Sequence, residues 1–183
     1  KNTLRVLSFN VWEVELLGGL INPSKHVDQR FDLMPEAINE LDADVIVLHE
    51  VWRNVRAAQL IKSFKRYGYE YNVRQAGPGV SITGFGNGLL ILSRLPLDSN
   101  IKVMSFSEHT RTDESVGLVY KGAIKTRIKL NDNWIDLYAS HLGAFSTLAK
   151  NNKSPSKENG GPDHFDVNHM RAKTHQATEL AQF

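Results

Sequence analysis

Apolar runs recur along the chain, and they predict a protein built largely of strands. The run at 44–51 is made mostly of β-branched and leucine residues, which is typical of a strand buried on both faces. Turn residues at 131–133 separate two of the runs, which are therefore expected to form a hairpin. The expected strands cover 4–11, 44–51, 88–93, 101–106, 117–130 and 134–142.

Apolar residues at helical spacing predict a helix between the first two strands. Phe31, Met34, Ile38 and Leu41 recur at intervals of three or four, and Pro35 is expected in the first turn, where its missing N–H costs little. The helix leads directly into the strand at 44–51. We therefore expect a strand–helix–strand unit over the first 51 residues.

Two more helices are expected further along the chain. One covers about 54–67 and ends at Gly68, and the other begins near 166. The apolar face expected for the helix at 54–67 consists of Val55, Ala58, Ile61 and Phe64. The loops between elements are expected at 13–25, at the glycine-rich 74–87 and at the polar 146–163. The glycine-rich run precedes a strand rather than a helix, so it is neither a P-loop nor a dinucleotide fingerprint, and a loop at the rim of the sheet is expected there.

Three polar residues each end a predicted strand. Asn10 ends the first, Glu50 ends the second and His141 ends the last. In an ideal strand Glu50 shares a face with Ile46 and Leu48. Taken singly, each residue has a structural interpretation: a turn-forming amide, an acid that meets solvent, and a histidine at the rim of the core.

If the three strand ends meet at one edge, they join an amide, a carboxylate and an imidazole. Mg²⁺ prefers oxygen ligands and is often held by one or two carboxylates, with water or phosphate completing its shell. A histidine can donate a proton to a leaving oxygen. This set suits phosphoester hydrolysis better than acyl transfer, because the chain has neither a Gly-x-Ser-x-Gly motif nor a cysteine.

Composition sets limits on these interpretations. The chain has 183 residues, enough for one domain, with ordinary hydrophobic and charged contents of 41% and 23%. Its net charge of +2 gives no strong indication of nucleic-acid binding. The absence of cysteine excludes disulfides and thiolate metal sites and leaves the compartment open. Because the chain begins at Lys1 and enters a strand almost at once, we expect that a preceding segment has been removed.

The ordered motifs of the chain resemble the endonuclease/exonuclease/phosphatase superfamily. Tyr-Lys-Gly-Ala at 120–123, and the polar loop before Arg-Ala-Lys-Thr-His-Gln at 171–176, are most similar to bacterial neutral sphingomyelinases of the phospholipase C type. The superfamily motifs are Leu-Ser-Phe-Asn-Val at 7–11, Asp-Val-Ile-Val-Leu-His-Glu-Val at 44–51, Gly-Leu-Leu-Ile-Leu-Ser-Arg-Leu-Pro at 88–96 and Ala-Ser-His-Leu at 139–142.

The resemblance implies an α/β fold, a two-layer β-sandwich flanked by helices in four α/β/β/α layers. It implies a Mg²⁺-dependent (or other divalent-cation-dependent) phosphodiesterase in which water attacks phosphorus in line. Glu50 would bind Mg²⁺, and Asn10 would lie beside the metal and the scissile phosphate. His141 would stabilise the phosphoryl transition state or protonate the leaving alkoxide. Lys121 would add positive charge near the phosphate; its alternative is a solvated lysine at a strand start.

The chain also departs from the family pattern. Family members continue to an Asp-x-Asn motif and a terminal Asp-His pair, which supply further contacts and the expected general base, and neither follows the helix at 171–183. Residues 1–183 are therefore expected to be the N-terminal portion of a single domain whose C-terminal half is absent, so the sandwich would be incomplete. His164, His169 and His175 precede the missing motifs.

Three functional hypotheses follow. The first is cleavage of sphingomyelin, a phospholipid substrate at a membrane surface, to ceramide and phosphocholine by a secreted bacterial protein. The second is a nuclease or inositol-phosphate phosphatase of the same superfamily, with near-neutral charge weighing mildly against DNA. The third is an inactive fragment that needs its C-terminal half.

Overall fold

The computed structural model describes residues 2–13, 24–74, 87–107, 121–142 and 164–183, with the side chains of 164–170 left aside. Strands and helices alternate as far as the second helix, and five described strands then follow one another before the last helix. The elements are β1 (Val6–Asn10), α1 (Val27–Asn39), β2 (Val45–His49), α2 (Asn54–Lys65), β3 (Tyr71–Arg74), β4 (Leu90–Ser93), β5 (Lys102–Ser105), β6 (Gly122–Leu130), β7 (Asn133–Ser140) and α3 (His164–Gln182).

The described strands form two sheets. The first sheet has the order β1-β2-β4-β3, in which β1 and β2 are parallel and the other pairs antiparallel. The second sheet is antiparallel with the order β5-β6-β7. The predicted strand–helix–strand unit is confirmed as β1-α1-β2, and the predicted hairpin is confirmed as β6-β7. The sequence analysis did not find β3, a four-residue strand at the edge of the first sheet.

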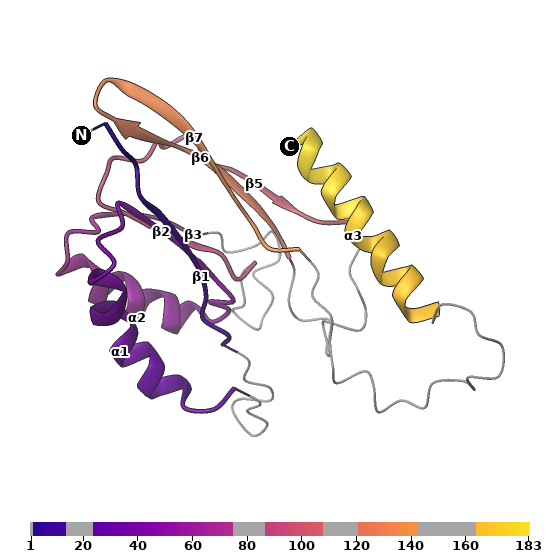
Figure 1. Cartoon of the computed structure of the whole chain (residues 1–183), viewed down its shortest axis with the longest axis horizontal. Coiled ribbons are helices and arrows are strands. Elements are labelled where there is room, and N and C mark those ends of the chain that lie inside the picture. The colour runs from indigo at the N-terminus through magenta and orange to yellow at the C-terminus, as the bar shows by residue number, and fades with distance from the viewer. Residues whose placement is uncertain (1, 14–23, 75–86, 108–120, 143–163) are drawn as a thin grey trace.

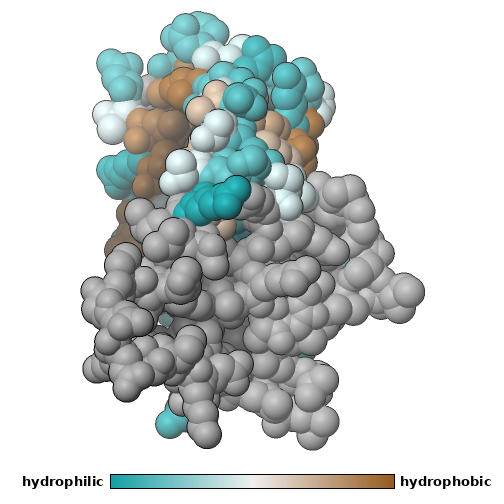
Figure 2. Space-filling view, turned by 90° about the vertical axis from the view of Figure 1, so that its right-hand side faces the viewer, coloured by the Kyte–Doolittle hydropathy of each residue, from teal (hydrophilic) through white to brown (hydrophobic). Residues whose placement is uncertain are grey.

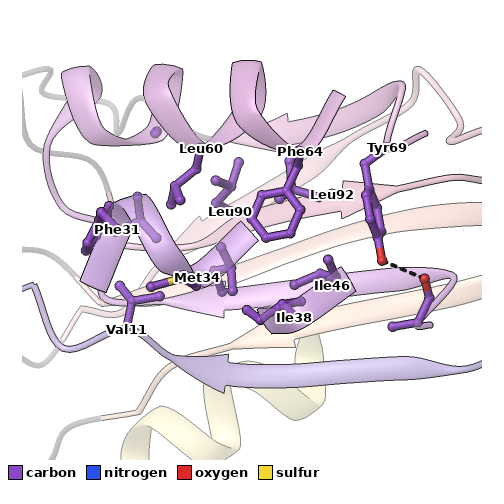
Figure 3. Close-up of a cluster of buried hydrophobic side chains, with 14 of the residues drawn as sticks. Val11, Phe31, Met34, Ile38, Ile46, Leu60, Phe64, Tyr69, Leu90 and Leu92 are labelled. Atoms are coloured by element: carbon purple, nitrogen blue, oxygen red, sulfur yellow. Dashed lines mark hydrogen bonds between the residues drawn. The ribbon is translucent and has the colours of Figure 1, made fainter. Parts of the chain in front are cut away.

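Two hydrophobic clusters hold the layers together. One lies between the first sheet and its helices. Figure 3 shows its residues Phe31 of α1 and Leu60 and Phe64 of α2 over the sheet. In the same cluster, Tyr69 donates a hydrogen bond to the carbonyl oxygen of Ala43 at 2.8 Å. The other lies between the two sheets. In Figure 1, α1 and α2 lie outside the first sheet and α3 lies beside β5. The expected α/β sandwich with outer helices is thus confirmed.

The first helix differs from its prediction at both ends. It stops at Asn39, so Leu41, which was predicted on its apolar face, lies beyond it and is 60% exposed. It begins at Val27, so Pro35 lies in its interior and not in its first turn. The apolar stripe extends further toward the N-terminus than expected, because Val27 and Phe31 are both buried. Their burial offsets the hydrogen bond that an interior proline removes.

The buried face of the second helix is rotated from the predicted one, although Phe64 is buried and Ile61 packs against the core as predicted. Ala57, Leu60 and Phe64 are buried, whereas Val55 is 74% exposed. Leu60 and Phe64 bury more apolar area against the sheet than Val55 and Ala58 could, so the helix is rotated accordingly. The predicted stop at Gly68 is confirmed: this glycine has φ +86° and donates its N–H to Lys65.

Most of each predicted loop lies outside the described residues, including most of 13–25, 74–87 and 146–163. In the part of the chain that is described, no helix combines the length and the hydrophobicity needed to cross a membrane. Figure 2 shows apolar residues interleaved with polar ones on the described part of one face.

Candidate functional site

The ends of β1 and β2 meet because the two strands are parallel and in register. Asn10 pairs with His49, and the backbone N–H of Val11 donates to the carbonyl oxygen of His49 at 3.0 Å. The side-chain oxygen of Asn10 accepts the backbone N–H of Trp12 at 2.8 Å. This turn directs the amide nitrogen of Asn10 toward the end of β2.

The carboxylate of Glu50 lies between the two sheets. Its Oε1 accepts a hydrogen bond from Asn10 Nδ2 at 3.0 Å and lies 3.6 Å from His141 Nε2. Strict alternation along the strand would have placed Glu50 with Ile46 and Leu48, which pack beneath the helices. That prediction was wrong, because β2 ends at His49 and Glu50 adopts a left-handed conformation with φ 63°. A non-glycine residue in this conformation costs about 1–2 kcal/mol, so its neighbours must hold it there.

His141 follows β7 and joins the same cluster from the second sheet. Its backbone N–H donates to Gly122 at 3.1 Å, and only 13% of its side chain is exposed. The rings of Trp52 and His49 lie 6.1 and 5.6 Å from the imidazole, stacked and edge-on respectively. The structure therefore brings the three predicted residues Asn10, Glu50 and His141 together.

Burial, followed by the nearby charges of Lys121 and His49, lowers the pKa of His141 to about 3. The imidazole is consequently neutral near pH 7 in these surroundings. Its 3.6 Å approach to Glu50 is a contact between a carboxylate and a neutral ring, not an ion pair. Among the described residues no hydrogen-bond partner reaches the buried Nδ1 of His141.

Lys121 lies close to this cluster and is buried. Only 6% of it is exposed, and its Nζ donates to the carbonyl oxygen of Leu142, directly after His141, at 3.2 Å. The alternative of a solvated lysine at a strand start is therefore wrong. Contact with a phosphate stays a prediction, and so do the roles assigned to Asn10, Glu50 and His141.

The donor set fits a hard cation with few protein ligands. Glu50 offers one partly exposed carboxylate, and Asn10 offers an amide oxygen that already accepts one N–H. Within the described ranges, no three His, Asp or Glu side chains are grouped to hold a metal. Such a site suits Mg²⁺, which commonly keeps water or phosphate oxygens in place of protein ligands.

The structure also shows four contributors that were not predicted from the sequence. Ser8 Oγ lies 2.9 Å from His49 Nε2, Trp52 stacks on His141, and the buried Glu13 accepts the backbone N–H of Trp52 at 2.7 Å. The positions of Ser8 and His49, two residues before Asn10 and one before Glu50, could have indicated them. Nothing in the sequence marks Glu13, because its partner is 39 positions away.

Gly88 makes room for the indole of Trp52. A Cβ at this position would lie 2.5 Å from the Trp52 ring, and Gly88 has φ +74°.

We expect Gly88→Ala to lower the free energy of unfolding by roughly 2–4 kcal/mol, from overpacking and backbone strain together. Gly68→Ala is the matched control: its φ is +86° and no atom lies within 4 Å of the added Cβ, so strain alone, about 1 kcal/mol, is expected. Urea unfolding measures both losses, and equal losses would contradict the packing of Trp52 on Gly88.

Comparison with known proteins identifies the family. Residues 7–177 match the sequence model of the Endonuclease/Exonuclease/phosphatase family. The chain belongs to this family. One curated relative is sphingomyelinase C of Bacillus cereus, which is 28% identical over 159 residues covering 80% of this chain and 45% of the relative. The chain thus spans less than half the length of this relative.

Solved structures share the fold of this family member. A β-hairpin deletion mutant of beta toxin from Staphylococcus aureus has a TM-score of 0.74 at 17% identity, covering 100% of this chain and 61% of the toxin chain. A double mutant of the same toxin with bound magnesium ions has a TM-score of 0.67 at 19% identity, covering 98% of this chain and 58% of its own. At these identities the likeness shows the fold alone.

Proposed function

We propose that the protein carrying this chain is a Mg²⁺-dependent phosphodiester hydrolase that cleaves sphingomyelin, or a related phospholipid, by in-line attack of water. The observation that supports this most is the contact of Glu50 with both Asn10 and His141 at the point where two sheets meet. A carboxylate, an amide and an imidazole within reach of one another can serve a phosphate and its counter-ion together.

Each residue has a distinct part in the proposed reaction. Bound Mg²⁺ would supply positive charge to the phosphate oxygens. Glu50 would hold the cation, and Asn10 would orient the Glu50 carboxylate through the 3.0 Å hydrogen bond and lie beside the phosphate. His141 would stabilise the phosphoryl transition state through an N–H hydrogen bond, as a neutral ring can, or protonate the leaving alkoxide after the negative phosphate has raised its pKa. Buried Lys121 would add positive charge near the phosphate.

Two considerations favour a phospholipid over the other phosphoesters. The curated relative named above is a sphingomyelinase C. A net charge of +2 gives little long-range attraction for a polyanion such as DNA. A secreted bacterial enzyme that works at a membrane surface is the setting that we propose. A nuclease or an inositol-phosphate phosphatase of the same family is the alternative.

We further propose that the C-terminal half of the same domain completes the sandwich at β1 and β7. These are edge strands of the two described sheets. Val6 on β1 and Ile135 on β7 face the space between the sheets, yet they are 48% and 37% exposed. Exposed apolar edges need cover. The extent of the match, 45% of the curated relative, leaves ample chain for this cover and for the expected general base.

Turnover of sphingomyelin, plasmid DNA and inositol polyphosphates by the full-length protein tests the substrate. We expect hydrolysis of sphingomyelin to phosphocholine and ceramide with Mg²⁺. Preferential cleavage of DNA or inositol phosphates would support the alternative instead.

The same assay on the 183-residue chain, alone and with the remaining half added, tests whether the C-terminal half completes the domain. We expect activity only in the combination, and full activity of the chain alone would contradict this proposal.

A further inference from the structure

Glu13 is a buried carboxylate between the end of β1 and the start of α2. It is 2% exposed. Its Oε2 accepts the backbone N–H groups of Trp52 and Arg53 at 2.7 and 3.2 Å, and its Oε1 accepts Arg53 Nε at 2.8 Å. One side chain thus joins the loop after β1 to the segment that follows Glu50.

The chemistry of α2 explains why a carboxylate is stable there. The N-cap residue Arg53 makes no side-chain capping bond, and the first turn of the helix has no acidic residue. The first N–H groups of a helix need acceptors, and a negative charge is favourable at that end. From another element, Glu13 supplies the negative charge and accepts the N–H of the N-cap residue Arg53. The pKa of Glu13 is raised overall, because the effect of burial exceeds the opposing effect of its bonds to Arg53 and Trp52.

The peptide unit that Glu13 binds is also held from the other side. Arg74 Nη2 donates to the carbonyl oxygen of Trp52 at 2.9 Å and approaches that of Val51 at 3.5 Å. With its N–H bound by Glu13 and its carbonyl bound by Arg74, the backbone of Trp52 is fixed. Its indole then lies between Gly88 and the imidazole of His141, where the two ring planes differ by 26°.

We propose that Glu13 is a positioning residue for this site, acting through Trp52 on the imidazole of His141. The Glu13 carboxylate sets the Trp52 backbone, the backbone sets the indole, and the indole sets the plane of the imidazole beside Glu50. The effect on catalysis rests on the proposed function, whereas the effect on the imidazole does not. If Glu13 only capped α2, its loss would lower stability and leave His141 in place.

The variants Glu13→Ala and Glu13→Gln separate the two roles in the full-length protein. Alanine removes every acceptor, whereas glutamine keeps an oxygen for the backbone N–H groups. We expect Glu13→Ala to lower kcat by about 10–100-fold with KM changed less than about threefold, and Glu13→Gln to keep kcat within about threefold. Gly68→Ala is the control, because it strains the opposite end of α2 in open space.

The imidazole is observed directly by NMR. The ring proton on Cε1 of His141, assigned by its loss in His141→Ala, is expected to be displaced upfield by the stacked Trp52 ring. We expect Glu13→Ala to move this resonance toward its value in an unstacked histidine, and Gly68→Ala to leave it unchanged. In a Trp52→Leu background, adding Glu13→Ala is expected to lower kcat no further, because both changes interrupt the same chain of contacts.

An unchanged His141 resonance in Glu13→Ala, or losses of kcat that add in the double variant, would overturn the proposal. If Glu13→Ala does not fold, Arg74→Gln tests the same claim from the carbonyl side of Trp52, and the same displacement is expected. A wild-type protein that turns over no phosphodiester contradicts the proposed function, and the resonance then decides the positioning role by itself.

Discussion

Glu50→Gln is expected to reduce phosphodiester turnover by about 10³-fold or more while leaving the fold intact. Glutamine keeps the shape of the side chain and an oxygen for the N–H of Asn10, but it removes the negative charge. Because Mg²⁺ is held by few carboxylates, the loss of this one removes most of its attraction to the site. The fold should tolerate the change, since glutamine has the same shape and the carboxylate forms no ion pair with the neutral His141.

The control for this variant is Glu70→Gln. Glu70 is an exposed acid that pairs with Lys65 at 3.5 Å near the end of α2, and such exposed pairs contribute little. We expect its turnover and its Mg²⁺ affinity, measured by calorimetry, to match those of the wild type. A Glu50→Gln protein that binds Mg²⁺ normally and keeps its rate, or one that does not fold, would contradict the metal role.

His141→Ala is expected to lower kcat by about 10²–10⁴-fold with Mg²⁺ affinity near that of the wild type. The imidazole lies 3.6 Å from the Glu50 carboxylate, so it is placed to act on the phosphate without serving as the primary attachment of the cation. Some loss of stability is also expected, because the ring fills the space against Trp52 and His49.

His175→Ala is the matched histidine control. His175 lies on α3, is 47% exposed and contacts Ser107 Oγ at 3.2 Å, so its removal should leave kcat unchanged. If His141→Ala loses as much Mg²⁺ affinity as Glu50→Gln does, then His141 is a metal ligand rather than an acid or hydrogen-bond donor. Unchanged kcat would exclude it from the reaction.

The parts of the fold that sequence predicted were those fixed by local periodicity. The apolar run at 45–49 had few alternatives to a buried strand, and Asn131 supplied the turn conformation, φ 54°, that the β6–β7 hairpin needed. The buried face of α2 was predicted only in part, because two apolar stripes that share Phe64 competed and tertiary packing selected the one with Leu60. The short strand β3 lacks a distinctive pattern, and only its pairing with β4 defines it.

In the site, too, some features could be predicted from local sequence and others depend on tertiary structure. Parallel pairing of β1 with β2 brings Asn10 beside the end of β2, and ordered motifs pointed to His141 on the second sheet. The direction of the Glu50 side chain could not be read from strand alternation, because it depends on a left-handed residue just beyond the strand. Glu13 was out of reach for another reason: two of its three hydrogen bonds come from backbone N–H groups, which have no signature in a sequence.

The central claim is that Glu50 gives this site a phosphodiesterase activity that depends on a divalent cation. The most direct test is a Mg²⁺ titration of sphingomyelin turnover by the full-length protein, starting from metal-free enzyme prepared with EDTA, in the wild type and in Glu50→Gln. The wild type is expected to be inactive without metal and to reach a saturating rate with Mg²⁺, whereas Glu50→Gln stays near background throughout. A wild-type rate that persists in EDTA, or equal Mg²⁺ curves for the two proteins, would contradict it.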